Sequence, residues 1–313
     1  MNQGVFSANL DLPAVVVHLV VVVQSRIRHA RPQPTDTLTL QQPAAYVRPM
    51  DLHLTGKVAV VTGASKGIGL AITRALVDEG ASVVAGARDV GGELTDLEAT
   101  AKVLAVPVDL STPNGPSELV ARSAHFGGLD IVVNNVGALT PRVDGFLSIS
   151  DEEWLATLNL SLLAAIRTTR AAIPLLLERG GGSVVTVASV NAYLPDPGVL
   201  DYSAAKAALW NVSKSLSKEY GPRGLRFNTV SPGPVETPLW LGEHGVAATI
   251  AAATGTDFET AKANTIAAQG GLTTGRFTRP EEVADLVVLL ASNRVGNVNG
   301  SDFMIDGGLV KGL

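Results

Sequence analysis

The stretch KVAVVTGASKGIGLAITRALVDEG, residues 57–80, decides the fold of this chain. Residues 57–63 form a short apolar run rich in valine, which predicts a strand that is buried on both faces. Residues 68–80 have the apolar spacing of a helix and end at a glycine, a common helix stop. Strand, glycine-rich turn and helix in that order are typical of the first unit of a dinucleotide-binding sheet.

The turn itself carries Gly63, Gly67 and Gly69 in the spacing Gly-x-x-x-Gly-x-Gly. Glycines permit a tight turn and a close approach of the backbone to a pyrophosphate, and a helix N-terminus offers free N–H groups to that anion. The spacing differs from the commoner Gly-x-Gly-x-x-Gly, and it lacks the Lys and Ser/Thr that complete a nucleoside-triphosphatase loop. A glycine turn alone is weak evidence, so its place between a strand and a helix carries the prediction.

The same alternation continues to the C-terminus and predicts an α/β fold. We expect one Rossmann-type doubly wound parallel sheet of about seven strands, with helices on both faces. The further strands are expected at residues 82–88, 102–110, 129–137, 182–189, 225–233 and 301–308, and the main helices at 151–179, from before Tyr202 to about Tyr220, and at 280–292. Pro174 should kink the first of these helices. Ligands of such sheets lie beyond the carboxyl ends of the strands.

Composition excludes several classes of protein. The net charge of −5 argues against nucleic acid as a partner. The 313 residues include no cysteine, which excludes disulfides, thiolate zinc sites and a cysteine nucleophile. The five histidines form no H-x-x-x-H pattern, so no metal site is expected. We expect a cytoplasmic protein that does not enter a membrane.

Residues 1–50 differ from the rest, and we predict that they form a non-essential or disordered N-terminal extension. Their apolar run at 12–24 is shorter than the roughly 20 residues that span a bilayer, and no basic segment precedes it. A protein beginning at Met50 is expected to keep its activity. The alternative is a tag that binds a membrane surface or a partner. Organised sequence, and one domain, is expected over 51–313.

The end of the second strand bears on the choice of cofactor. It reads GARD, with Ala87 where an NAD-binding chain usually has an acidic residue, followed by Arg88. Lys66 adds a second cation within the glycine turn. Two cations without the acid favour a 2′-phosphate, so we predict NADP(H) rather than NAD(H). The alternative is that both cations are solvated and Asp89 binds the ribose of NAD(H).

Other polar side chains follow later strands. Asp109 is placed either to accept a hydrogen bond from an adenine amino group or to cap the next helix. Asn134 and Asn135 can fasten neighbouring loops and strands, and Gly137 leaves room for a ribose.

Tyr202 and Lys206 stand four residues apart in the alanine-rich stretch LDYSAAKAAL, residues 200–209. Alanine favours helix, and residues four apart share a helical face, so the phenol and the ammonium should point the same way. By themselves, the two residues fit an exposed helix face equally well.

Six motifs together decide the matter: TGASKGIG (62–69), NNVG (134–137), LNLSLL (158–163), TVASV (186–190), YSAAK (202–206) and SPGPVETP (231–238). In this order and spacing the chain resembles the short-chain dehydrogenase/reductase family over residues 52–313, and is similar to bacterial 3-oxoacyl-[acyl-carrier-protein] reductases. The family usually has NNAG where Val136 stands here, a small departure.

The resemblance implies four catalytic residues. Tyr202 matches the family's acid/base, and Lys206 would lower the pKa of that phenol and hold the nicotinamide ribose. Ser189 would hydrogen-bond the substrate oxygen, and Asn159 would hold a water in a proton relay. Ser189 could instead satisfy a backbone group, and Asn159 could be a core amide bonded to a carbonyl.

The resemblance also implies the remainder of the site. The cofactor-binding residues are expected to be Gly63, Ser65, Lys66, Gly67, Ile68, Gly69, Arg88, Asp109, Leu110, Asn135, Gly137, Tyr202, Lys206, Pro232, Gly233, Val235 and Thr237. Residues 238–274, rich in Ala, Gly and Thr, are expected to form a mobile loop-like lid over a small-molecule carbonyl or alcohol substrate, with Trp240 as a hinge anchor. A homotetramer or homodimer is expected.

Three functions remain open on the sequence. The first is an NADP(H)-dependent oxidoreductase that interconverts a carbonyl and a secondary alcohol. The second is an NAD-dependent alcohol, sugar or steroid dehydrogenase. The third is a nucleotide-sensing protein that keeps the fold without turnover.

Overall fold

The computed structural model describes residues 50–312. The predictions made for residues 1–49 lie outside the described residues and stay predictions.

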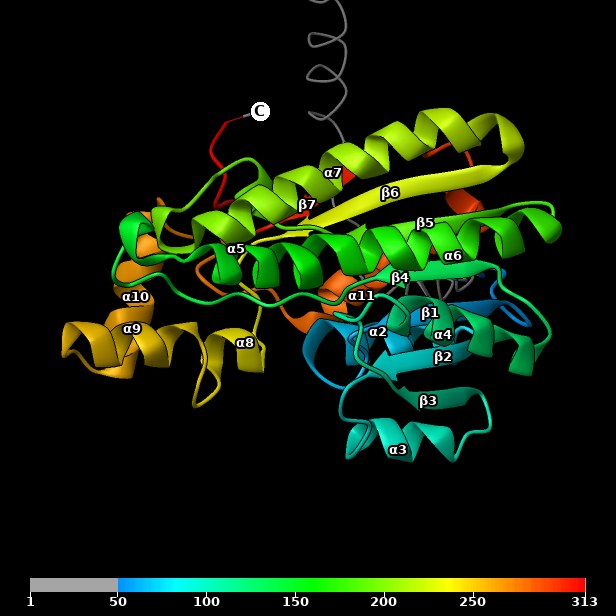
Figure 1. Cartoon of the computed structure of the whole chain (residues 1–313), viewed down its shortest axis with the longest axis horizontal. Helices are drawn as coiled ribbons and strands as arrows, with labels where there is room; N and C mark the ends of the chain where they lie inside the picture. The colour runs from blue at the N-terminus through cyan, green and yellow to red at the C-terminus, as the bar shows by residue number, and fades with distance from the viewer. Residues whose placement is uncertain (1–49, 313) are drawn as a thin grey trace, which may run out of the picture. The chain divides into compact units, whose positions relative to one another are not determined.

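A single parallel sheet organises the described residues (Figure 1). Its strand order is β3-β2-β1-β4-β5-β6-β7, and every neighbouring pair is parallel. The strands are β1 (Val58–Thr62), β2 (Ser82–Ala87), β3 (Val103–Pro107), β4 (Ile131–Asn134), β5 (Gly182–Val187), β6 (Leu225–Pro232) and β7 (Asp302–Ile305). The predicted seven-stranded doubly wound sheet is confirmed. The direction of winding reverses between β1 and β4, which is where such sheets bind ligands.

Helices cover both faces of the sheet. The main ones are α2 (Gly67–Asp78), α4 (Gly115–Ala121), α6 (Ala164–Glu178), α7 (Leu200–Tyr220) and α11 (Pro280–Ala291), with a short α3 (Glu93–Glu98) beside β3. Figure 1 shows α6 and α7 in front of the sheet, while α2 and α11 pack against each other on its other face.

Alternation along the strands explains why two cores form. In β1, Val60 faces one cluster with Leu119 and Leu176, whereas Val61 faces the other cluster with Ile72. All five of these side chains are fully buried. Burying each such side chain contributes roughly 1.5–3 kcal/mol, which is why strands covered on both faces are apolar throughout.

The helix expected at residues 151–179 has a different irregularity from the one predicted. It is divided into α5 (Asp151–Leu158), a π-helical turn (Asn159–Leu163) and α6, which continues through Pro174. Ser150 begins α5 with a capping box, since its side chain accepts from the Glu153 N–H and the Glu153 side chain accepts from the Ser150 N–H. The departure from α-helical geometry therefore lies at Asn159, a type of irregularity that is frequent at functional sites.

The segment Asp151–Glu178 is long and apolar enough to cross a membrane by length and composition alone. In the structure one side of α6 is buried, including Thr168, Ala172 and Leu176, and it contacts α4, β4 and β5. That packing accounts for the apolar composition as the core-facing side of a helix.

The lid expected at residues 238–274 is helical rather than loop-like. It contains α8 (Pro238–Leu241), α9 (Val246–Thr254) and α10 (Phe258–Ala268). Asp257 caps α10 by accepting from the Thr260 N–H at 2.9 Å. Trp240 packs edge-on against Phe277 with ring centroids 5.5 Å apart, which ties α8 to the segment before α11.

Candidate active site

One cavity of about 1070 Å³ lies at the carboxyl ends of the strands. The structure brings to it every site residue predicted from the sequence except Asn159. Some of these residues follow β1 to β4 and others follow β5 and β6, so segments far apart in the chain share the cavity.

The glycine turn after β1 can exist only with glycine at several positions. Gly63 and Gly67 have φ of 68° and 54°, in the left-handed region. A Cβ on Gly69 would lie 2.1 Å from the Gly63 carbonyl oxygen, so no side chain fits there. The N–H groups of Gly63 and Ala64 donate to the Gly86 carbonyl at 2.8 and 3.1 Å, which holds the turn against β2. The turn thus presents backbone to the cavity where α2 begins, and it fits a pyrophosphate.

Two asparagines fasten the neighbouring strand ends, as expected. Asn135 Nδ2 donates to the carbonyls of Thr62 and Gly63 at 3.0 and 3.1 Å. Asn134 Nδ2 donates to Thr169 Oγ1 at 2.9 Å and so ties β4 to α6. Only Asn135 lines the cavity, whereas Asn134 is buried behind it.

The structure places both cations considered for a 2′-phosphate near the end of β2. Ala87 is buried, and the exposed side chains of Lys66 and Arg88 both belong to the cavity lining. Asp89 also lines the cavity, and its Oδ1 accepts from the Gly91 N–H at 3.2 Å.

Asp109 lies in the same region, in a turn after β3. Its Oδ1 accepts from the hydroxyl and the N–H of Ser111 at 2.7 and 2.9 Å, and these hydrogen bonds lower the pKa of Asp109. The alternative that Asp109 caps the next helix is wrong, because α4 begins after Asn114.

Tyr202 and Lys206 lie in the first turns of α7 and are both buried. Lys206 Nζ lies 5.4 Å from the centre of the Tyr202 ring and donates to the Val187 carbonyl at 2.8 Å. Because Val187 ends β5, this bond fixes the start of α7 to the strand that leads to Ser189.

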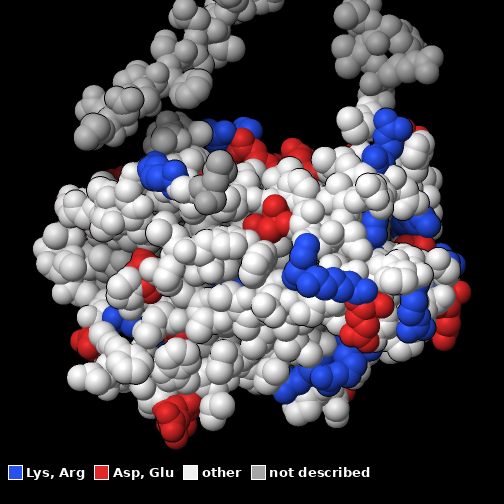
Figure 2. Space-filling model, turned by 90° about the horizontal axis from the view of Figure 1, so that it is seen from above, with Lys and Arg blue, Asp and Glu red and all other residues white. Residues whose placement is uncertain are grey.

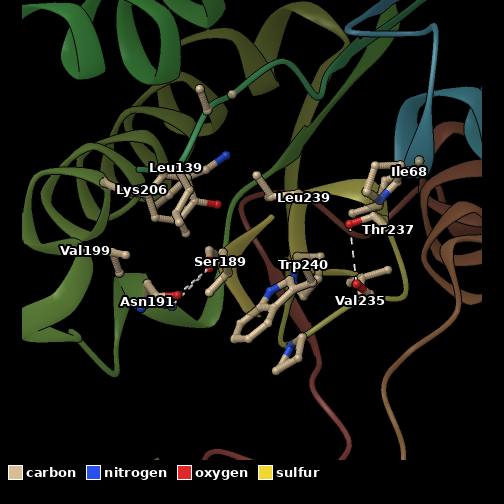
Figure 3. Close-up of a pocket in the computed structure, with 18 of the residues that line it drawn as sticks. Ile68, Leu139, Ser189, Asn191, Val199, Lys206, Val235, Thr237, Leu239 and Trp240 are labelled. Atoms are coloured by element: carbon tan, nitrogen blue, oxygen red, sulfur yellow. Dashed lines mark hydrogen bonds between the residues drawn. The ribbon is translucent and has the colours of Figure 1, made fainter. Parts of the chain in front are cut away.

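Ser189 is buried beside Asn191 (Figure 3). Its hydroxyl donates to Asn191 Oδ1 at 3.1 Å and accepts from the Asn191 N–H at 3.2 Å. The alternative, that Ser189 satisfies a backbone group, is therefore realised, and its contact with a substrate stays a prediction. A hydroxyl with a second acceptor site and a rotatable proton can still turn toward a ligand oxygen in the cavity.

The pKa values differ from the expectation that Lys206 would lower the pKa of Tyr202. Burial raises the pKa of Tyr202 to about 12, with the Ser189 side chain acting in the opposite direction, and burial lowers the pKa of Lys206 to about 8. The reason is desolvation, which disfavours the phenolate and the ammonium alike. Near neutral pH the phenol therefore keeps its proton and is a donor.

Asn159 is the predicted residue that the structure places elsewhere. Its Nδ2 donates to the Ser111 carbonyl at 2.6 Å, and its Oδ1 accepts from Arg167 Nη1 at 2.7 Å. The side chain thus joins the π-helical turn to the loop after β3, which matches the alternative of an amide bonded to a carbonyl. Its part in a proton relay stays a prediction.

Sequence reasoning missed three polar features of the cavity wall. Asn191 lies beside Ser189, and its place two residues after that serine was a signal. Arg142 Nη2 pairs with Asp201 Oδ2 at 2.5 Å, and the position of Asp201 next to Tyr202 was another signal. Gln269 Nε2 donates to Asp196 Oδ2 at 2.6 Å, and nothing in the sequence pointed to that pair.

Known proteins are similar to this chain over most of its length. A family model described as enoyl-(acyl carrier protein) reductase matches residues 63–310. A 3-oxoacyl-[acyl-carrier-protein] reductase of Thermotoga maritima is 33% identical over 83% of this chain and 100% of its own length. A D-threitol dehydrogenase of Mycolicibacterium smegmatis is 34% identical over 82% of this chain and 94% of its own length.

Solved structures give the same answer. The L-sorbose reductase of Gluconobacter frateurii, complexed with NADPH and L-sorbose, superposes with a TM-score of 0.75 at 35% identity, over 84% of this chain and 100% of that one. The fold and the sequence similarity agree. The chain therefore belongs to the short-chain dehydrogenase/reductase family, a family of NAD(P)H-dependent oxidoreductases.

Proposed function

We propose that this protein interconverts a carbonyl and a secondary alcohol with NADP(H), with Tyr202 as the acid/base. The observation that carries the proposal is the single cavity that joins the glycine turn and two exposed cations to Tyr202, Lys206 and Ser189.

The residues around the glycine turn fit a phosphorylated dinucleotide. Gly63 and Gly69 allow its pyrophosphate to approach the backbone, and Lys66 and Arg88 can pair with a 2′-phosphate. Val235 and Thr237, on the loop after β6, would contact the nicotinamide end. When bound, the cofactor supplies the hydride for reduction or accepts it in oxidation.

The protein's own groups handle the proton. In reduction, the Tyr202 hydroxyl donates its proton to the substrate oxygen, and the Ser189 hydroxyl donates a hydrogen bond to the same oxygen. Lys206, one turn further along α7, supplies positive charge beside the phenolate that remains. In oxidation the same phenolate takes the proton back from the alcohol.

Asp89 supports the alternative of an NAD-dependent dehydrogenase, because its carboxylate lines the same part of the cavity as Arg88. The competition between these two side chains decides the cofactor. The nucleotide-sensing alternative has less support, since Ser189, Tyr202 and Lys206 are all present in the cavity.

We also propose self-association into a homodimer or homotetramer through α5 and α7. Leu155 and Trp210, on these two helices, are 66% and 38% exposed. Figure 2 shows that the molecular face seen from above Figure 1 has long stretches without charged side chains, with more Lys and Arg on the right of the view than on the left. Light scattering at several protein concentrations tests this; a monomer at all of them contradicts it.

The catalytic proposal is tested with purified full-length protein and a panel of ketones, by following nicotinamide absorbance with NADPH and with NADH. We expect turnover with NADPH at a higher kcat/KM than with NADH. Ser189→Ala should reduce kcat about a hundredfold without weakening NADPH binding, since it removes one donor to the developing oxyanion. Preference for NADH contradicts the cofactor assignment, and binding of NADPH without turnover of any ketone favours the sensor.

A further inference from the structure

We propose that the substrate is a neutral, largely apolar ketone or secondary alcohol rather than an anionic one such as a carboxylate or a phosphate-bearing thioester. The inference rests on the proposed function and adds the chemical class of substrate. It concerns the substrate half of the cavity, defined here as its lining residues within 138–143, 187–206 and 238–269.

Apolar side chains make up most of the wall around Ser189. In the view of Figure 3, Leu139 and Val199 lie to the left of Ser189. Leu239 and Trp240 lie to its right, between Ser189 and the loop that carries Val235. Leu194 and Ile250 extend this wall. Apolar surface of this kind gains roughly 25 cal/mol for each Å² of ligand surface that it removes from water, and it offers nothing to a charge.

The cations of the substrate half are already engaged. Among the described residues that line it, the only Lys and Arg side chains are Lys206 and Arg142. Lys206 donates to a backbone carbonyl deep in the cavity. Arg142 is 7% exposed and pairs with two carboxylates, those of Asp201 and Glu153. An anionic substrate would have to break one of these interactions to pair with a lysine or an arginine of this half.

The acidic side chains of this half oppose an anion further. Asp196 lines it and holds its carboxylate between the Gln269 amide at 2.6 Å and the Gly198 N–H at 2.8 Å. Glu243 is exposed on the lid. At an effective dielectric constant of about 20, two like charges 4 Å apart repel by roughly 4 kcal/mol, so a carboxylate near Asp196 is strongly disfavoured.

Of the polar side chains that remain in this half, His244 is an exposed imidazole on the lid, and the others are neutral amides and hydroxyls. The Asn191 amide oxygen accepts from Ser189, and the Gln269 amide nitrogen donates to Asp196, so Asn191 keeps its NH₂ and Gln269 keeps its amide oxygen for other partners. A hydroxyl or a carbonyl is the natural partner for such groups. The cofactor half differs, because its cations Lys66 and Arg88 are exposed in the cavity. The molecule thus separates recognition of anions from recognition of the substrate.

Matched substrate pairs test the inference directly. We would measure kcat/KM with NADPH for methyl 4-oxocyclohexanecarboxylate against the free acid, for ethyl 3-oxobutanoate against 3-oxobutanoate, and for a 3-oxoacyl N-acetylcysteamine thioester against its coenzyme A thioester. We expect the neutral member to be favoured at least about tenfold in every pair that reacts. Equal or better turnover of the anionic members overturns the inference while leaving the proposed function intact. Absence of any turnover, with NADPH bound, contradicts the proposed function and removes the inference with it.

Variants that add a positive charge show whether the substrate half itself disfavours anionic substrates. Gln269→Lys places a cation against the Asp196 carboxylate, offsets its repulsion and should raise kcat/KM for the anionic members about tenfold relative to the neutral ones. Asn264→Lys makes the same charge change at an exposed position of α10 outside the cavity lining and should leave the ratio unchanged. Thr265→Lys, also in the lining, replaces Gln269→Lys if that variant does not fold. An identical ratio in the lining variants and in Asn264→Lys contradicts the inference.

Discussion

The two halves of the cavity are lined by different parts of the chain, one in large part by backbone and the other mostly by side chains. Around the glycine turn much of the wall is backbone: a Cβ on Gly69 would collide with the Gly63 carbonyl, and Asn135 donates to the Thr62 carbonyl. Around Ser189 the wall is made of side chains such as Leu239 and Trp240, carried on short helices. Backbone contacts restrict which residues are possible, whereas an apolar wall accepts many residues of similar size. We therefore expect substitutions in the first half to act on cofactor binding and those in the second to act on substrate choice.

Among the variants that compare the two halves, the largest effect is expected for Gly69→Val. A Cβ at this position would lie 2.1 Å from the Gly63 carbonyl oxygen, so the glycine turn must move. NADPH binding, followed by quenching of tryptophan fluorescence, should weaken about a hundredfold, since such overpacking costs roughly 1–3 kcal/mol or more. Gly91→Ala is the control, because its Cβ would meet only Asp89 Oδ1 at an ordinary 3.5 Å. Equal losses of NADPH affinity in both variants would contradict the special requirement for glycine at position 69.

Arg88→Ala should have the next largest effect. Loss of a charged hydrogen bond to the 2′-phosphate costs about 1.5–3 kcal/mol, so the ratio of kcat/KM for NADPH over NADH should fall about tenfold to a hundredfold. Arg122→Ala removes an exposed arginine outside the cavity lining and should not change the ratio. An unchanged ratio in Arg88→Ala would show that another side chain binds the 2′-phosphate of NADPH.

The pH dependence of reduction should report Lys206. Its pKa of about 8 means that the ammonium is present below that pH and is lost above it, while Tyr202, with a pKa of about 12, stays protonated. We expect kcat for ketone reduction to fall as pH rises through about 8, by about tenfold per unit once the ammonium is lost. Lys206→Arg keeps the charge and should move this decline to higher pH. If kcat declines at the same pH in the unsubstituted protein and in Lys206→Arg, the decline does not come from the Lys206 ammonium.

The smallest effect is expected for Gln269→Ala. It removes the hydrogen bond that ties the lid to Asp196 and should raise KM for a neutral ketone about twofold to tenfold, with the NADPH dissociation constant unchanged. Asn264→Ala, exposed on α10, is the control. A parallel change in NADPH affinity would show that the two halves are coupled.

The same difference explains what could be predicted from the sequence. The strands were found because burial on both faces demands near-continuous apolar runs, as in residues 57–63. The glycine turn was found because positive φ and close backbone contact leave few alternatives to glycine at Gly63 and Gly69. Tyr202 and Lys206 were found through their helical spacing together with the family motifs.

The rest depended on partners distant in the chain. The π-helical turn at Asn159 goes with bonds to Ser111 and Arg167, which no local pattern reveals. The lid was expected as a loop from its small residues, yet alanine also favours helix, and Asp257 provides a cap. The pairing of Asp196 with Gln269 joins residues 73 positions apart, so only the folded chain shows it.

The central claim is that the Tyr202 hydroxyl delivers the proton in carbonyl reduction. Tyr202→Phe, compared with the unsubstituted protein in a single turnover with NADPH and a ketone that the protein reduces, tests it most directly. The account predicts a rate of NADPH oxidation lower by about 10² to 10⁴, with NADPH binding nearly unchanged. A rate within a few-fold of that of the unsubstituted protein would contradict it.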